Sequence, residues 1–120
     1  MKTIVLILIQ SVITLAVSSC YQFKEASCQE VADEYKADHL NLVVKKKPYS
    51  AYKLRIDGFD PASKENRIFR RQNYTWAQSF ILQIAVGDTV IKHKGELKFY
   101  IHKKDTVLVF PFECDGKVYE

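Results

Sequence analysis

The three histidines are the residues best suited to acid–base or metal chemistry, but their spacing supports neither. His39, His93 and His102 are isolated in the sequence, and no His-x-His, Cys-x-x-Cys or His-Glu-x-x-His motif is present to bind a metal. We therefore predict no metal, no cofactor and no catalytic residue. The alternative is a hydrolase whose site is assembled by the fold from distant residues, such as His102 and Asp105.

The first twenty residues have the layout of a secretory signal peptide. One charged residue, Lys2, precedes an apolar run from Ile4 to Val17, and small residues lead from there into Cys20. This run is shorter than the roughly 20 apolar residues that a transmembrane helix needs. Its charge, length and small-residue end predict that residues 1–19 are a cleaved signal peptide.

The end of this segment, Val17-Ser18-Ser19-Cys20, resembles the lipobox of bacterial lipoproteins. The resemblance implies diacylglycerol transfer to the Cys20 sulfur, cleavage before Cys20, and acylation of the new amino group by a fatty acid such as palmitate. The membrane would then be a partner through the lipid. Tyr21 rather than aspartate follows the cysteine, which is similar to lipoproteins sent to an outer membrane, and this similarity implies that location. The alternative is ordinary cleavage after Ser19, which would give a secreted or periplasmic protein.

Lipidation of Cys20 would explain why the chain has an odd number of cysteines. Three cysteines are an odd number for an exported protein. If the lipid occupies Cys20, then Cys28 and Cys114 remain, and an oxidising compartment favours their pairing. Such a disulfide would close nearly the whole domain and contribute about 4 kcal/mol to its stability. Two unpaired thiols are the alternative.

The chain after the signal peptide has the size of one small domain. Removing residues 1–19 takes only Lys2 from 18 basic and 14 acidic side chains, which leaves a formal charge of +3. That charge is too small to indicate nucleic-acid binding. We predict a lipidated tether over 20–26 and a single domain over 27–120.

The spacing of apolar residues and the positions of turn-forming residues predict a mainly β domain with one short N-terminal helix. Ser27 and Glu30 have the form of a capping box, and the helix is expected to end near Asp38. After Leu40 the apolar residues alternate with period two, as in half-buried strands. The strands expected are 40–44, 52–57, 80–86, 89–92, 97–102, 106–112 and 117–119, with the 97–112 stretch as a hairpin. About six to seven short antiparallel strands with closely spaced turns predict a small barrel or sandwich.

One segment suggests a contact surface. Three arginines lie among three aromatic residues between residues 67 and 76, and arginine, tyrosine and tryptophan are enriched at interaction hot spots. The residues that could contact a partner are Arg67, Arg70, Arg71, Tyr74 and Trp76. The alternative interpretation, which we prefer, is an amphipathic edge strand whose aromatic side chains belong to the core.

These features predict a lipid-anchored protein of the cell envelope that binds a protein or glycan partner without catalysing a reaction. An immunity or inhibitor protein is one form of this prediction, and an envelope hydrolase is the alternative. The C-terminal part, from Val86-Gly87-Asp88-Thr89 through Phe112 to Tyr119, is similar to that of small lipoproteins of Bacteroidota-type bacteria. This similarity implies no particular activity.

Overall fold

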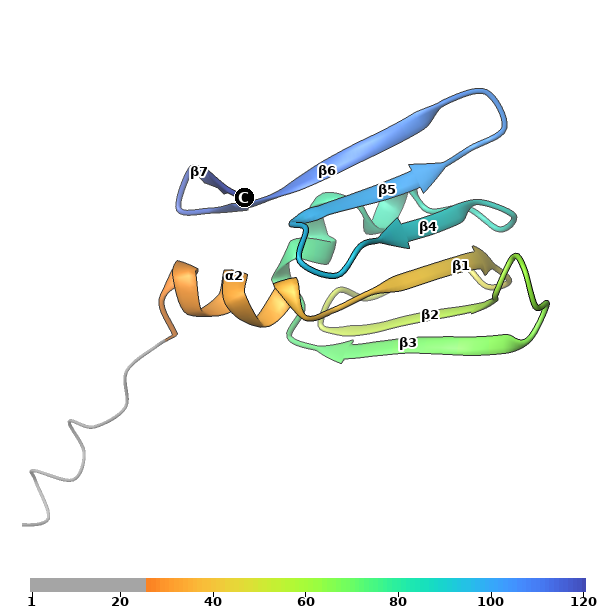
Figure 1. Ribbon diagram of the computed structural model, residues 1–120, viewed down its shortest axis with the longest axis horizontal. Helices are drawn as coiled ribbons and strands as arrows, with labels where there is room; N and C mark the ends of the chain where they lie inside the picture. Colours follow the sequence, from red (N-terminus) through yellow and green to blue (C-terminus); the bar gives the residue numbers. More distant parts are fainter. Residues whose placement is uncertain (1–25) are drawn as a thin grey trace, which may run out of the picture.

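The computed structural model describes residues 26–120, which form a seven-stranded antiparallel sheet, one α-helix and two short 3-10 helices (Figure 1). The predicted signal peptide, Cys20 and the tether as far as residue 25 lie outside these residues. The elements are α2 (Cys28–Lys36), β1 (Leu40–Val44), β2 (Lys53–Phe59), β3 (Asn66–Gln72), η2 (Thr75–Ser79), η3 (Ile81–Gln83), β4 (Thr89–Lys92), β5 (Lys98–His102), β6 (Val107–Cys114) and β7 (Lys117–Tyr119).

Helix α2 begins at the predicted cap. The Ser27 hydroxyl accepts a hydrogen bond from the Glu30 backbone amide at 3.2 Å, which satisfies one of the amides left unpaired at a helix start. Ala32 and Tyr35 are buried on the inner face of the helix. The helix is therefore stabilised by packing as well as by its cap, because an isolated helix of this length is marginal in water.

The strands follow the order β3-β2-β1-β4-β5-β6-β7, and every neighbouring pair is antiparallel. The mainly β class with a single N-terminal helix is therefore confirmed, and the predicted hairpin is β5–β6. The turn between β6 and β7 is the Asp115-Gly116 pair, with φ of 52° and 75°. Positive φ at both residues is typical of the type I′ turn that Asp-Gly favours.

The strand predicted over 80–86 is wrong, because η3 and the turns on either side of it occupy that part of the chain. Phe80, Ile81 and Ile84 are buried, whereas Leu82 is 79% exposed. Burial at i, i+1 and i+4 fits helical turns rather than a strand, in which every second residue shares a face. The alternation of apolar residues over 80–86 therefore does not reflect a strand. These residues form turns whose apolar side chains cover the inner face of the sheet.

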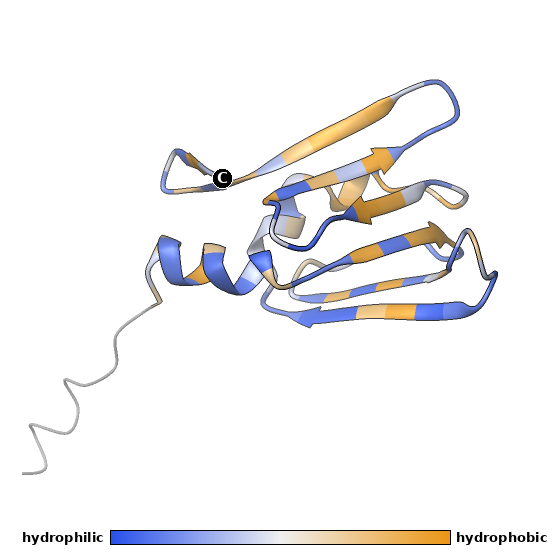
Figure 2. Ribbon diagram, viewed as in Figure 1, coloured by the Kyte–Doolittle hydropathy of each residue, from blue (hydrophilic) through white to orange (hydrophobic). Residues whose placement is uncertain are grey.

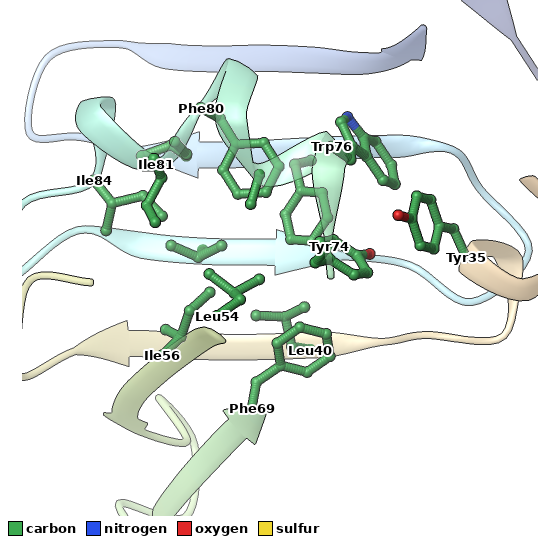
Figure 3. Packing of buried hydrophobic residues seen from close by; sticks show 14 of the residues in the cluster. Tyr35, Leu40, Leu54, Ile56, Phe69, Tyr74, Trp76, Phe80, Ile81 and Ile84 are labelled. Atoms are coloured by element: carbon green, nitrogen blue, oxygen red, sulfur yellow. The ribbon is translucent and has the colours of Figure 1, made fainter. Parts of the chain in front are cut away.

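The core is an aromatic cluster between the sheet, α2 and the 3-10 turns. Figure 3 shows Tyr74, Trp76 and Phe80 directed into it, together with Tyr35 of α2. The Phe80 and Phe99 ring centroids are 4.3 Å apart and stacked, and the Trp76 and Phe99 centroids are 4.8 Å apart and edge-on. Aromatic pairs of this geometry add stability beyond the area they bury.

The disulfide predicted between Cys28 and Cys114 is present, with Cα atoms 5.8 Å apart. It joins the first residue of α2 to the last residue of β6, 86 positions apart in sequence. In Figure 1, α2 lies at the same end of the molecule as the β6–β7 turn. The bond therefore fixes the start of the domain to the last hairpin of the sheet.

Candidate binding groove

A gap in strand pairing borders one of the concavities of the described domain. β1 pairs with β2 only through Val43↔Phe59 and Val44↔Gly58. Toward its start, β1 therefore has β4 on one side and no strand on the other. β3 stands at the end of the sheet order, so its outer edge also has no strand partner in the part of the chain that the structure describes.

Gly58 allows β2 and β1 to meet and then separate. A Cβ atom at this position would clash with the Val43 carbonyl oxygen, which is a backbone atom and cannot swing aside. A glycine inside a strand often marks such a close backbone approach. The two strands can therefore approach this closely, before they separate beside β1, only because residue 58 is a glycine.

A groove of about 660 Å³ lies beside the unpaired part of β1. We call it the β1–β3 groove; its walls are residues 40–42 of β1 and 67–69 of β3, with 91–94 at the end of β4. Successive side chains of a strand point to opposite faces. Consecutive residues of both strands line the groove, so backbone as well as side-chain atoms contribute to its walls.

The hydrogen-bond register indicates which backbone groups face this groove. The Val44 amide donates to Asp88 on the β4 side, and the Lys45 amide donates to Asp57 on the β2 side, both at 2.8 Å. Since antiparallel residues alternate between their two neighbours, the amide and carbonyl of Asn41 point away from β4. They therefore lie on the side where β2 is missing.

The same argument applies to β3. The Asn73 amide donates to the Tyr52 carbonyl at 2.8 Å, so residues 69 and 71, of the same parity, direct their backbone groups toward β2. The backbone groups of Ile68 and Arg70 consequently point to the open edge. Strand edges of this kind can pair with another extended chain.

The rim of the groove carries more positive than negative charge. Arg67 and Lys94 are cations with exposed side chains, and His39 and His93 add two exposed imidazoles. Arg67 forms a 3.1 Å ion pair with Glu65, in which both side chains are more than half exposed. An exposed pair of this kind is weak, so Arg67 can exchange Glu65 for another anion at little cost.

Asp60 is the acidic residue of the groove lining, and its carboxylate is already engaged. Oδ1 accepts hydrogen bonds from the Ser63 and Ala62 amides, at 3.0 and 2.8 Å. These backbone bonds lower the pKa of Asp60 and hold it ionised. It stabilises the loop between β2 and β3, and the groove as a whole favours an anion.

Lys92 lies at the base of the groove and is only 1% exposed. Its ammonium donates to the backbone carbonyls of Asp38 at 2.8 Å and His93 at 3.2 Å. Burial lowers the pKa of this lysine, although the charges of Asp38 and Glu96 oppose the shift. An ammonium has three N–H groups, so the two carbonyls leave one without a protein acceptor.

A polar cluster beneath the groove joins the start of β1 to the end of β3. Arg71 donates from Nε and one terminal nitrogen to Asp38 Oδ1, at 2.9 and 2.5 Å. Its guanidinium carbon also lies 4.5 Å from the centroid of the Phe69 ring. The buried Tyr74 hydroxyl makes no hydrogen bond of good geometry, although the Asp38 carboxylate is nearby. Burial, together with the charge of Asp38 and its interaction with the hydroxyl, raises the pKa of Tyr74.

The predicted contact residues separate into two groups. Tyr74 and Trp76 are 1% and 4% exposed, so the prediction that they contact a partner is wrong. The chain turns inward at Asn73, where φ is 53°, and the Trp76 indole donates to the Pro111 carbonyl at 3.1 Å. Arg71 is held by Asp38, whereas Arg67 and Arg70 are exposed on β3. Of the five residues, Arg67 lines the groove and Arg70 continues along the same edge.

The residues suggested for the hydrolase alternative lie away from the groove. His102 is exposed on β5, and Asp105 is exposed in the turn that follows it. Within residues 26–120 no histidine is ion-paired with a carboxylate. The sequence did not predict the groove. Its one local signal is Gly58, which directly follows the predicted strand 52–57.

Comparison with known proteins identifies no relative. No protein-family model matches the chain, and neither a curated protein nor a solved structure is significantly similar to it. None of the helices within residues 26–120 has the length and apolar character needed to cross a membrane.

Proposed function

We propose that this protein is a lipid-anchored module of the cell envelope, located at the outer membrane, which binds a partner in the β1–β3 groove and catalyses no reaction. The observation that carries the proposal is the groove, where the unpaired part of β1 borders a cavity with a positive rim. Natural proteins usually cover or pair such edges. An uncovered strand edge beside a cavity therefore favours a binding role.

The cysteines support the anchor. Cys28 and Cys114 are bonded to each other, so Cys20 has no pairing partner within its own chain and is available for a lipid. A structural disulfide also fits an exported protein, since such bonds persist in oxidising compartments.

The anchor is tested by Cys20→Ser expressed in a bacterium with a lipoprotein export pathway. We expect the unmodified protein to fractionate with membranes and to carry acyl chains on residue 20 by mass spectrometry. The variant should lack acylation and leave the membrane fraction. Membrane association of wild-type protein without acyl groups would contradict the proposal.

The binding role is tested by placing a photo-crosslinking amino acid at Asn41, inside the groove, in living cells. A matched protein carries the same group at Leu82, which is exposed on η3 and does not line the groove. We expect an adduct from position 41 that excess uncrosslinkable protein competes away, and no such adduct from position 82. Equal labelling at both positions would remove the groove from the proposal.

A further inference from the structure

We propose that a basic face on β2 and β3 lies against the anionic surface of the membrane to which Cys20 is attached. This face combines exposed cations of β2, β3 and the loop before β2 with two exposed tyrosines of that loop. The residues that we call the basic face are Lys46, Tyr49, Tyr52, Lys53, Arg55 and Arg70. The inference rests on the lipid anchor of the proposed function and adds the orientation in which the anchor holds the domain.

The cations of β2 and β3 share the outer face of this strand pair. Leu54 and Ile56 are buried, and successive side chains of a strand point to opposite faces, so Lys53 and Arg55 point outward. In the strand register, Arg55 lies directly opposite Arg70. Like charges in this arrangement repel each other. An external anion would therefore stabilise the pair.

The carboxylate of Asp57 neutralises only part of this charge. It forms an ion pair with Arg55 at 2.8 Å. The hydrogen bond from Arg55, together with the charges of Lys46 and Arg70, lowers the pKa of Asp57. Within residues 26–120, Lys46, Lys53 and Arg70 have no ion-pair partner. The basic face therefore keeps a net positive charge.

A hollow of about 380 Å³ lies within the basic face. Tyr49, Lys53, Arg55 and Arg70 line it, and its lining in the described domain includes no acidic side chain. Guanidinium groups bind phosphate oxygens through charge-assisted hydrogen bonds. The hollow therefore suits the phosphate headgroup of a lipid.

The tyrosines favour a membrane over a dissolved anion. Tyr49 is 89% exposed and Tyr52 is 69% exposed. Exposed tyrosine rings cost little at a membrane surface, because an apolar ring with a polar hydroxyl is suited to the headgroup region. A small anion in water would leave both rings exposed, whereas a lipid surface can cover them.

The anchor brings this face within reach of the membrane. Residues 21–27, which separate Cys20 from α2, span at most about 25 Å. Just after α2, Asp38 pairs with Arg71, which is the neighbour of Arg70 on β3. Figure 1 shows that β2 begins and β3 ends on the side of the sheet where α2 lies. A domain held at this distance is attracted through the face that carries the unpaired cations.

The test uses the acylated protein in vesicles made of equal parts of phosphatidylglycerol and phosphatidylcholine, whose brominated acyl chains quench tryptophan fluorescence. Tyr49→Trp places a reporter on the basic face. Leu82→Trp places one at an exposed position of η3, which packs on the inner side of the sheet. Unmodified protein gives the background from buried Trp76. We expect much stronger quenching in Tyr49→Trp than in Leu82→Trp.

The acyl chains hold the protein on every vesicle, so changes in quenching report the orientation of the domain. Quenching of Tyr49→Trp should fall in pure phosphatidylcholine and at about 1 M salt, because the attraction is then absent or screened. Adding Arg70→Gln should lower the ratio of membrane-contacting to free domains by about fivefold. Lys104→Gln removes an exposed cation from the turn after β5 and should leave this ratio unchanged.

The outcomes separate the orientation from the anchor. Equal quenching of the two reporters, or quenching that Arg70→Gln does not reduce, overturns the orientation, although acylated residue 20 would still support the anchor. Inorganic phosphate or a polyglutamate peptide that shifts the Arg55 and Arg70 Nε resonances in NMR, without quenching by lipid, assigns the face to a dissolved anion or an acidic protein and also overturns it. Wild-type protein without acyl chains on residue 20 refutes the anchor and the orientation together.

Discussion

The two ends of the sheet are stabilised in different ways. At the β6–β7 end, a disulfide joins α2 to β6, and Phe112 and Tyr119 pack with ring centroids 5.8 Å apart. At the β3 end, the Arg71–Asp38 ion pair and the edge-on packing of Phe69 against Tyr74, with centroids 6.1 Å apart, join the strand to the rest of the domain. Figure 2 shows the same contrast in composition, with β6 mainly hydrophobic and β3 hydrophilic on both sides of an apolar centre.

The difference shows how a small domain can leave a strand edge open. Charged residues on an edge strand discourage unselective pairing with other chains, and β3 carries Arg67, Arg70 and Arg71. Arg67 and Arg70 remain exposed on this strand, whereas Arg71 is held by Asp38. A covalent link at the opposite end contributes the stability that an open edge does not provide.

The largest expected effect is loss of the covalent link. Replacing both Cys28 and Cys114 by alanine should lower the free energy of unfolding by about 4 kcal/mol, through the larger entropy of the unfolded chain. Urea denaturation followed by tryptophan fluorescence measures this, because Trp76 is the single tryptophan and is buried. Wild-type protein unfolded with a reductant is the control and should match the variant. A loss below about 1 kcal/mol would mean that the two ends differ less than proposed.

The second largest effect on stability is expected at Gly58, where the pairing of β2 with β1 ends. Gly58→Val should destabilise the domain by about 1–3 kcal/mol, because the new side chain overlaps the Val43 carbonyl and forces the strands apart. Thermal unfolding of this variant should be compared with that of Lys53→Val, which places the same side chain at an exposed position of β2. Equal melting temperatures in the two variants would show that the close approach is unimportant.

A smaller effect is expected at the β3 end. Arg71→Met should cost about 1–2 kcal/mol, a value at the low end for bonds to a charged group because the arginine is partly exposed. Arg70→Met is the matched control, because Arg70 is the neighbouring arginine and its side chain is exposed. This substitution should change the free energy of unfolding by less than about 0.5 kcal/mol. Denaturant midpoints of the two variants measure the difference. Equal midpoints would indicate that the ion pair does not hold β3.

The smallest effect is expected for Tyr74→Phe. The buried hydroxyl makes no hydrogen bond of good geometry, so its removal should leave stability unchanged or raise it by about 0.5–1 kcal/mol. The measurement is the melting temperature, with Tyr52→Phe as an exposed control. A loss of more than about 1 kcal/mol would show that the hydroxyl is engaged, and that the β3 end has a second polar link.

Much of the fold could be predicted because its signals are local. The Ser27 cap, the alternation in β1 and β5, and the Asp115-Gly116 turn each depend on a few neighbouring residues. The 3-10 turns could not be predicted in the same way. Phe80 to Val86 alternate like a strand, and only the packing of Phe80 against Phe99 shows which side chains are buried.

The site was less predictable than the fold. Arg67 and Arg71 have the same residue type and lie on the same strand, yet one lines a groove and the other binds a buried carboxylate. The carboxylate is Asp38, which is 33 positions away from Arg71 in sequence. No local pattern contains that information, because it depends on where β3 ends relative to the start of β1.

The sequence by itself determined the class of fold, the helix start, the hairpin and the choice of cysteines for the disulfide, since residue type and spacing are sufficient for each of these. Only the tertiary structure decided that Tyr74 and Trp76 belong to the core and that a groove opens between β1 and β3. Both depend on contacts between distant segments, and on a strand pairing that stops after two residue pairs. Burial and edge exposure are properties of the assembled sheet, whereas caps and turns are properties of a short stretch of chain.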